Sequence, residues 1–305
     1  MRKHAVLLIA HQNPEHQLKL INYLGDSFDF FIHYNKKSKL TENDIKAFTA
    51  LPNVKLFSQK YEVNWGGVTL TKIILYLGGE AIKNKDYKYI IVLSGQDFPI
   101  KSRQSILNFY NENEGKQFLL NFPLPAPWWE NGGYERFNYY HFFDIVNGRN
   151  HLGQKMINFL VKIQKIIGLN RDIKSKLPPM YGGSSWFSVT TDCMDYCIHY
   201  FDKHKGIFKL INHTFAPDEM IFHTIIMNSE YEKSVQNDNL FFISWGEDPS
   251  PLTLDDSFFP VLKSSDKLFA RKFISPTSTS LIEKLTDLNS DTLNNKEELL
   301  NSGAG

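Results

Sequence analysis

The chain has 305 residues, which is enough for one large domain or two small ones. Its 34 basic and 33 acidic side chains give a formal net charge of +1. This balance argues against bulk electrostatic binding to nucleic acid, which usually requires a basic excess. Because 42% of the residues are hydrophobic and 14% aromatic, a packed core is expected.

The cysteines and apolar runs indicate the compartment. Cys193 and Cys197 lie four residues apart in a segment of helical character, which favours core packing in a reducing compartment over a disulfide or a metal site with His199. The apolar run Ala5–Ala10 is too short for a signal peptide core or a membrane span, and no stretch elsewhere reaches the length of a span. We therefore expect a cytoplasmic protein without a transmembrane segment, and peripheral contact with the inner face of the membrane stays open.

The first 120 residues alternate between apolar runs and segments of helical periodicity. Helices are expected after Asn13 and Thr41, which suit N-caps, and again after Gly67. The expected strands are Ala5–Ala10, Phe28–Tyr34, Val54–Phe57 and Tyr87–Ser94. This alternation predicts an α/β fold with a mostly parallel sheet and right-handed crossovers.

Polar residues lie at the carboxyl ends of three of these strands. They are His11 and Gln12, then His33 to Lys36, and then Ser94 to Asp97. Ligands of parallel sheets bind outside the carboxyl ends of the strands, so these residues predict a binding crevice.

The second half of the chain is less regular. An aromatic and proline-rich loop at 122–144 precedes an amphipathic helix at 151–169, and further helices are expected after Thr190 and Ala216. A strand is expected over Asn239–Trp245. From Ser275 the chain is polar, which predicts a short helix at 280–288 and then a flexible tail. Glycine-rich phosphate loops of the GxGxxG and GxxxxGK types do not occur.

The segment "APDEMIFHTII" places two carboxylates near a helix start. Pro217 suits the first helical position, with Asp218 and Glu219 in the first turn. Such carboxylates can serve only to stabilise the helix dipole. Alternatively, a rigid helix start can present a general base to a hydroxyl group.

The segment "KLFARKF" places Arg271 and Lys272 between apolar residues. These cations are either snorkelling side chains at a strand end or a clamp for phosphate oxygens. The chain contains no strict Asp-x-Asp, the pair through which Mg²⁺ or Mn²⁺ is commonly held in nucleotide-sugar enzymes. Without it, basic side chains would have to stabilise the charge of a leaving group.

Two further segments have open interpretations. "YGGSSWFSVT", which contains Ser184, is either a flexible turn or a loop that admits a sugar or phosphate. "PWWENGGYERFNYYHFF" is either an aromatic core cluster or a platform for sugar rings. Its residues that suit an acceptor are Trp128, Trp129, Glu135 and Arg136.

Seven motifs in order resemble one glycosyltransferase family, the core-2/I-branching β-1,6-N-acetylglucosaminyltransferases and peptide O-xylosyltransferases. They span about Ile32 to Phe273 and their order is more specific than any single motif. The matching segments are "FFIHYNKKS", "VNWGGVTLTKIILYL", "LSGQDFPIKS", "YGGSSWFSVT", "APDEMIFHTII", "ISW…SPLTL" and "LFARKF".

The resemblance implies a GT-A-like fold and an inverting transfer from a UDP-sugar, with GlcNAc or xylose as the sugar, that needs neither a metal nor another cofactor. It assigns the catalytic base to Glu219 and the neutralisation of the diphosphate to Lys272, with Arg271 as its neighbour. The family's "HVD" segment reads "HYN" here, so Asn35 replaces the usual Asp. The animal members carry a membrane anchor, a stem and disulfides, so we expect a compact, bacterial-type relative.

These implications complete the list of candidate site residues. Asp97 either orients a hydroxyl of the donor sugar or supports the backbone. The expected partners are a UDP-sugar and a glycan or glycolipid acceptor. The expected donor-binding residues are His11, His33, Asn35, Trp65, Gly95, Asp97, Ser184, Arg271 and Lys272.

One catalytic domain is expected over residues 1–274, with the nucleotide-sugar half at 1–120 and the acceptor and catalytic half at 121–274. The C-terminal helix and tail take up 275–305. One alternative function is a nucleotide-sugar or carbohydrate-binding protein without catalysis. A glycoside hydrolase is another, but it needs a second acid across the sugar from Glu219, and the adjacent Asp218 is expected to point elsewhere.

Overall fold

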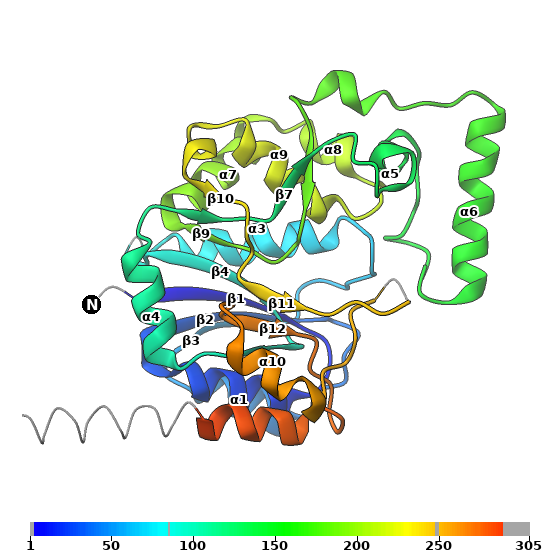
Figure 1. The fold of residues 1–305 in the computed structure, drawn as a ribbon. Coiled ribbons are helices and arrows are strands. Elements are labelled where there is room, and N and C mark those ends of the chain that lie inside the picture. Colours follow the sequence, from blue (N-terminus) through cyan, green and yellow to red (C-terminus); the bar gives the residue numbers. More distant parts are fainter. Residues whose placement is uncertain (1–2, 85, 248–249, 289–305) are drawn as a thin grey trace, which may run out of the picture.

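The computed structural model describes residues 3–84, 86–247 and 250–288, and its centre is a seven-stranded sheet in the order β10-β6-β9-β4-β1-β2-β3 (Figure 1). Strands β1, β2, β3 and β4 are all parallel and form its core. Their bounds are β1 His4–Ala10, β2 Phe28–Tyr34, β3 Val54–Ser58 and β4 Tyr89–Ser94. All four strands lie within one or two residues of the predicted positions.

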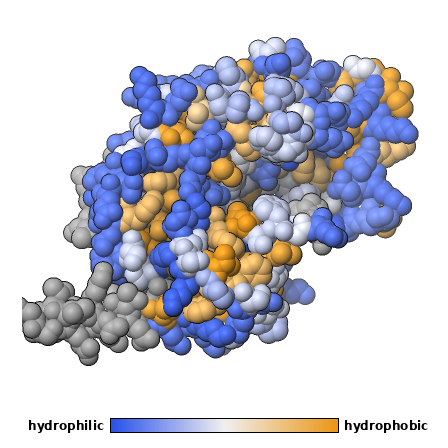
Figure 2. Space-filling model, viewed as in Figure 1, coloured by the Kyte–Doolittle hydropathy of each residue, from blue (hydrophilic) through white to orange (hydrophobic). Residues whose placement is uncertain are grey.

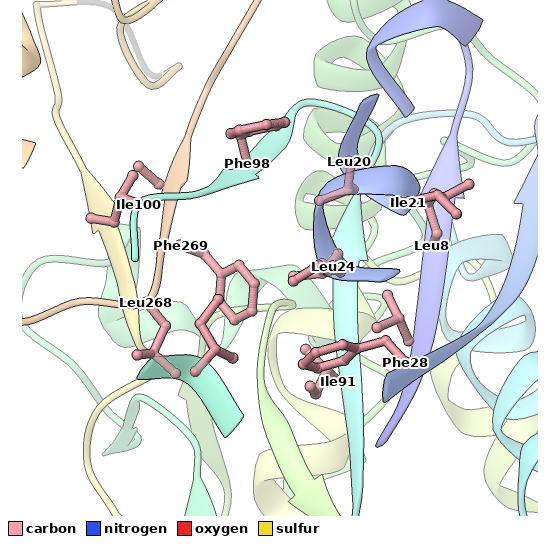
Figure 3. Close-up of a cluster of buried hydrophobic side chains, with 14 of the residues drawn as sticks. Leu8, Leu20, Ile21, Leu24, Phe28, Ile91, Phe98, Ile100, Leu268 and Phe269 are labelled. Atoms are coloured by element: carbon pink, nitrogen blue, oxygen red, sulfur yellow. The ribbon is translucent and has the colours of Figure 1, made fainter. Parts of the chain in front are cut away.

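Helices cover both faces of this sheet (Figure 1). Successive side chains of β1 enter opposite cores because a strand has a period of two: Leu8 packs on one face and Leu7 on the other. Figure 3 shows the first core, where side chains of β1, β4 and α1 lie beside those of a second sheet. Helices α1 (Pro14–Leu24) and α2 (Glu42–Thr49) border this core, and α3 (Thr69–Ala81), α7 (Thr191–Lys203) and α9 (Ile221–Met227) border the other. The predicted α/β class with a mostly parallel sheet is confirmed.

The sheet continues with shorter strands. β9 (Ser188–Thr190) is antiparallel to β4 and to β6 (Gln117–Phe118), and β10 (Val235–Gln236) is parallel to β6. A separate pair consists of β7 (Asn121–Pro123) and β8 (Tyr181–Gly183).

A three-stranded sheet joins two of the motifs that the sequence singled out. Strand β12 (Phe269–Arg271) pairs in parallel with β11 (Phe241–Ile243) and antiparallel with β5 (Asp97–Pro99). In this register Arg271 lies directly opposite Asp97. Residues far apart in the sequence are thus neighbours at the carboxyl edge of the central sheet.

The remaining helices lie around these sheets. Helix α6 stands at one end of the molecule in Figure 1, joined to the body by two long connections. A helix over 279–288 confirms the predicted C-terminal helix, while the predicted flexible tail lies outside the described residues. The bounds of the others are α4 Arg103–Glu112, α5 Glu135–Asn138, α6 His151–Ile166, α8 Ile207–Ile211 and α10 Phe259–Ser264.

Two predicted helix starts differ in their chemistry. Thr41 caps α2 as expected, in a reciprocal capping box with Asp44. The side chain of Asn13 does not cap α1: its backbone is left-handed, with φ of 58°, and its Nδ2 donates instead to Ser275 Oγ at 3.1 Å. The side chain of this residue therefore ties the start of α1 to the C-terminal segment.

The predicted helix at Pro217 is interrupted. Pro217–Glu219 forms a 3₁₀ turn, Met220 has non-helical backbone angles, and α9 begins at Ile221. Glu219 therefore lies on a short turn before the helix, and not in the first turn of an α-helix as predicted.

Both cysteines are buried and free in α7, as expected for core packing. Within the described residues, no helix is both long and apolar enough to cross a membrane.

Candidate active site

Glu219 is partly exposed and pairs with a cation from helix α5, Arg136. Ala216, in the left-handed conformation with φ of 47°, turns the chain into the short 3₁₀ segment that carries Glu219. Arg136 Nη1 donates to Glu219 Oε2 at 2.7 Å. The side chain of Glu219 is 37% exposed and that of Arg136 is 20% exposed, so the carboxylate is oriented yet accessible.

Aromatic rings hold Arg136 in place. Its guanidinium carbon lies 3.8 Å from the ring centre of Trp129 and 4.8 Å from that of Phe215. Trp65 packs on the same Phe215, with ring centres 5.4 Å apart. The fixed guanidinium can therefore direct the carboxylate of Glu219 toward a ligand.

The other acceptor candidates lie differently. Trp128 is 66% exposed and packs edge-on against Phe122. Glu135 faces away from Glu219, since its carboxylate binds Lys165 Nζ at 2.7 Å and accepts a hydrogen bond from Asn131. Trp129 and Arg136 thus lie beside the proposed base, whereas Glu135 joins α5 to α6.

Asp218 points into the protein, as expected. It is buried, and its Oδ2 accepts a hydrogen bond of 2.5 Å from Ser185 Oγ. Burial and then the nearby charge of Glu219 raise the pKa of Asp218. The two neighbouring carboxylates therefore have different environments: Asp218 is buried, whereas Glu219 is accessible to solvent.

Arg271 forms the second charged centre of the site. Its Nε lies 3.6 Å from Asp97 Oδ1, and its guanidinium lies over the ring of Trp186 at 4.5 Å. Burial lowers the pKa of Arg271, while the charges of Asp97 and Glu219 act in the opposite direction. The cation therefore lies within electrostatic range of both carboxylates.

Asp97 is fully buried and serves its own loop. Its Oδ2 accepts from the backbone N–H of Ser94 and its Oδ1 from Ser94 Oγ, both at 2.7 Å. Desolvation raises the pKa of Asp97, and the charge of Arg271 opposes this. Of its two possible roles, this geometry favours support: Asp97 closes the loop after β4 and holds Arg271.

Lys272 extends toward a different loop. Its Nζ donates to Ser250 Oγ at 2.7 Å. Burial lowers the pKa of Lys272, and the charges of Arg271 and Arg149 lower it further. Arg149, which the sequence did not single out, also lowers the pKa of His11, second to desolvation. The charge of Arg149 therefore acts on two of the candidate donor-binding residues, Lys272 and His11.

A pocket of about 340 Å³ lies at the carboxyl edge of the central sheet. Gly95 is required there, because a Cβ atom on it would lie 2.7 Å from the Cβ of Ala10. The glycine thus allows the loop after β4 to pack closely on the end of β1. The pocket is lined by Gln12, Asn13, Gly95, Gln96, Phe273, Ile274 and Ser275.

Three further donor candidates make contacts within the protein. His33 is buried and its Nε2 accepts from the backbone N–H of Tyr61 at 3.0 Å. The side chain of Asn35 donates to Val63 O and accepts from Val63 N–H, both at 3.1 Å. Ser184 Oγ accepts from the backbone N–H of Trp186, the residue beneath Arg271. These contacts position loops around the site, and direct contact with a donor stays a prediction.

Within the described residues, no group of three or more His, Cys, Asp or Glu side chains is arranged to hold a metal ion. The possible grouping of Cys193 and Cys197 with His199 is not formed, because His199 pairs with Asp195 on the exposed side of α7 and both cysteines are buried.

Comparison with known proteins gives a family match. A family model described as Core-2/I-Branching enzyme matches residues 10–256. Xylosyltransferase oxt of Drosophila pseudoobscura pseudoobscura is 22% identical over 226 residues, which cover 71% of this chain and 23% of that protein. Xylosyltransferase 2 of Rattus norvegicus is 23% identical over 306 residues, which cover 92% of this chain and 33% of that protein. The chain thus spans only about a quarter to a third of the curated relatives that it matches.

Among solved structures, the chain is similar to mouse xyloside xylosyltransferase 1 in its apo form, with 11% sequence identity, a TM-score of 0.40, and coverage of 90% of this chain and 99% of that one. The family match extends over most of the chain and includes Asp97 and Glu219. The chain therefore belongs to the Core-2/I-branching enzyme family of glycosyltransferases.

Proposed function

We propose that this chain transfers a sugar from a UDP-sugar to a hydroxyl group of a glycan or glycolipid, with inversion at the anomeric carbon and without a required metal ion. Xylose and GlcNAc are the favoured sugars. Xylose is supported by the names of the relatives and GlcNAc by the resemblance of the motifs to the branching enzymes.

One arrangement carries the proposal: Asp218, the neighbour of Glu219, binds Ser185, and Arg271 lies over the ring of the next residue, Trp186, so that the exposed carboxylate and the cation belong to one site. The carboxylate can take a proton, and the cation can stabilise negative charge on a leaving group. A protein that only binds sugars has no need for this pair.

The proposed reaction is a single displacement. Glu219 removes the proton of the acceptor hydroxyl as that oxygen forms a bond with the anomeric carbon. The bond between the anomeric carbon and the β-phosphate oxygen breaks, and UDP leaves with the electron pair. Arg271 and Lys272 stabilise the charge on the departing diphosphate, each by about 2–4 kcal/mol in such electrostatic roles.

Metal independence is supported by the residues at the site. The chain has no Asp-x-Asp, and the positive charges of Arg271 and Arg149 both act on Lys272, which lowers its pKa. Fixed cations of this kind can supply the charge that a divalent ion supplies elsewhere.

A panel of UDP-sugars tests the proposal. The donor is expected to raise the melting temperature of the protein by binding the folded state, and UDP should be released when aryl glycoside acceptors are added. NMR of the product should show the inverted anomer. Binding of a UDP-sugar without release of UDP over the whole acceptor panel would indicate a binding protein and contradict transfer.

A further inference from the structure

The outer face of α6 exposes a continuous row of large apolar side chains. Their exposed fractions range from 38% to 78%, although such residues are usually buried. Their spacing of three and four residues places them on one side of the helix. Figure 2 shows apolar surface at the end of the molecule where α6 lies. We name this row the α6 stripe: Leu152, Met156, Phe159, Ile163, Ile166 and the following Ile167.

The opposite side of α6 is already attached to the body. Gln164 Oε1 accepts from Tyr140 N–H and its Nε2 donates to Tyr140 O, both at 2.8 Å. Lys165 binds Glu135. Gly153 and Ile157 are buried on this side. The helix is therefore held in place by one face while the α6 stripe faces outward.

The charged side chains of the segment that carries the α6 stripe are all basic. Residues 145–171 contain five Lys or Arg residues and no Asp or Glu, although the whole chain has a net charge of only +1. Lys155 and Lys162 are exposed and fall beside the stripe in the helical period. An apolar face bordered by lysines is the pattern of helices that lie in the plane of a membrane surface.

We propose that α6 docks this protein on an anionic lipid surface, with the α6 stripe in the acyl boundary and Lys155 and Lys162 at the lipid headgroups. The charge complementarity favours lipid over a second copy of the chain. In a two-fold contact the same surface patch of both copies meets, which would bring two sets of like-charged lysines into one interface. On an anionic bilayer each lysine is instead attracted.

Vesicle sedimentation tests the proposal and does not depend on sugar transfer. The full chain should sediment with vesicles of phosphatidylglycerol and phosphatidylcholine in equal parts, and poorly with phosphatidylcholine alone. The double variant Leu152→Glu with Phe159→Glu should lower the bound fraction at least ~10-fold, because it places charge in the acyl boundary. Lys155→Gln with Lys162→Gln should weaken binding and reduce its dependence on salt.

Val261→Glu, a change at an exposed apolar residue of α10, is the matched control and should sediment like the wild type. Unchanged melting temperatures would show that the variants fold. The proposal is overturned if the wild type does not sediment with anionic vesicles, or if the double variant sediments equally well. The α6 stripe would instead bind a second copy of the chain if the wild type does not bind vesicles, is a dimer in light scattering, and becomes a monomer in the variant Phe159→Glu.

Discussion

Arg136 Nη1 lies 2.7 Å from Glu219 Oε2, and the same guanidinium stacks on Trp129. The two residues are 83 positions apart, so the orientation of the proposed base depends on helix α5 and the loop before it, which belong to a different part of the chain. This loop also carries the aromatic candidates for the acceptor. Acceptor binding and the position of the base are therefore coupled through one side chain.

Replacing Glu219 by Gln should abolish proton removal while preserving the shape of the site. Turnover is expected to fall by roughly 10²–10⁴-fold, with the affinity for the UDP-sugar nearly unchanged. Steady-state UDP release and donor titration by thermal shift measure the two effects. Glu112→Gln, on the exposed side of α4, is the control and should be fully active. Normal turnover in Glu219→Gln would assign the base elsewhere.

Replacing Arg136 by Ala should release the carboxylate of Glu219 from its fixed orientation. The loss of a charge-assisted hydrogen bond predicts a decrease in kcat of about 10-fold or more, with little change in donor affinity. Arg136→Lys keeps the charge but loses the planar stack on Trp129, so its activity should lie between that of the wild type and that of Arg136→Ala. A change confined to the acceptor KM would show that Arg136 only binds the acceptor.

Removing the ammonium group of Lys272 should slow departure of the diphosphate. Lys272→Ala is expected to lower kcat/KM by roughly 10–10³-fold and to weaken inhibition by UDP. Lys263→Ala, which removes an exposed lysine of α10, is the control and should behave like the wild type. If Lys272→Ala binds UDP and turns over normally, Arg271 alone provides the charge.

The buried Asp218 should make stability depend on pH. Its pKa is raised by burial and by Glu219, so the folded state favours the protonated form. Protonated Asp218 contributes fully to the free energy of unfolding below the pKa of an ordinary Asp side chain. This contribution is lost as the pH rises through the raised pKa of the folded state. From pH 4 to pH 8 the wild type should lose more than about 1 kcal/mol of unfolding free energy relative to Asp218→Asn. Urea denaturation at several pH values in this range measures the unfolding free energy of both proteins. The prediction is contradicted if the two free energies change with pH in the same way.

Treatment with EDTA should leave sugar transfer largely intact, because the proposed charge stabilisation comes from Arg271 and Lys272. Activity measured before and after dialysis against EDTA checks this. Loss of activity that Mn²⁺ restores would show that a divalent ion takes part.

The sequence predicted the parallel core because continuous apolar runs such as that of Phe28–Tyr34 are typical of strands covered on both faces. It also predicted the cap at Thr41, whose hydrogen bonds are local. These features depend on neighbours in the chain, and periodicity reports such neighbours well.

The rest of the site depends on contacts between distant residues. Arg149 lies in a loop with no recognisable pattern, so its effect on Lys272 could not be predicted. From the sequence, Glu135 and Arg136 were equally suitable for binding an acceptor. In the structure Glu135 pairs with Lys165 instead. The turn that carries Glu219 was expected as a helix, because neither the left-handed Ala216 nor the break at Met220 has a sequence signal.

The pairing of β5 with β12 determines when the cationic side of the site can form. Asp97 is made 174 residues before its partner Arg271. An emerging chain that has not yet exposed β12 has Asp97 without its counter-ion and lacks both cations proposed to hold the diphosphate. The cationic side of the site therefore forms only after β12 has been made, and a protein shortened before Phe269 would lose it together with the buried side chains of Phe269 and Phe273 that complete the first core.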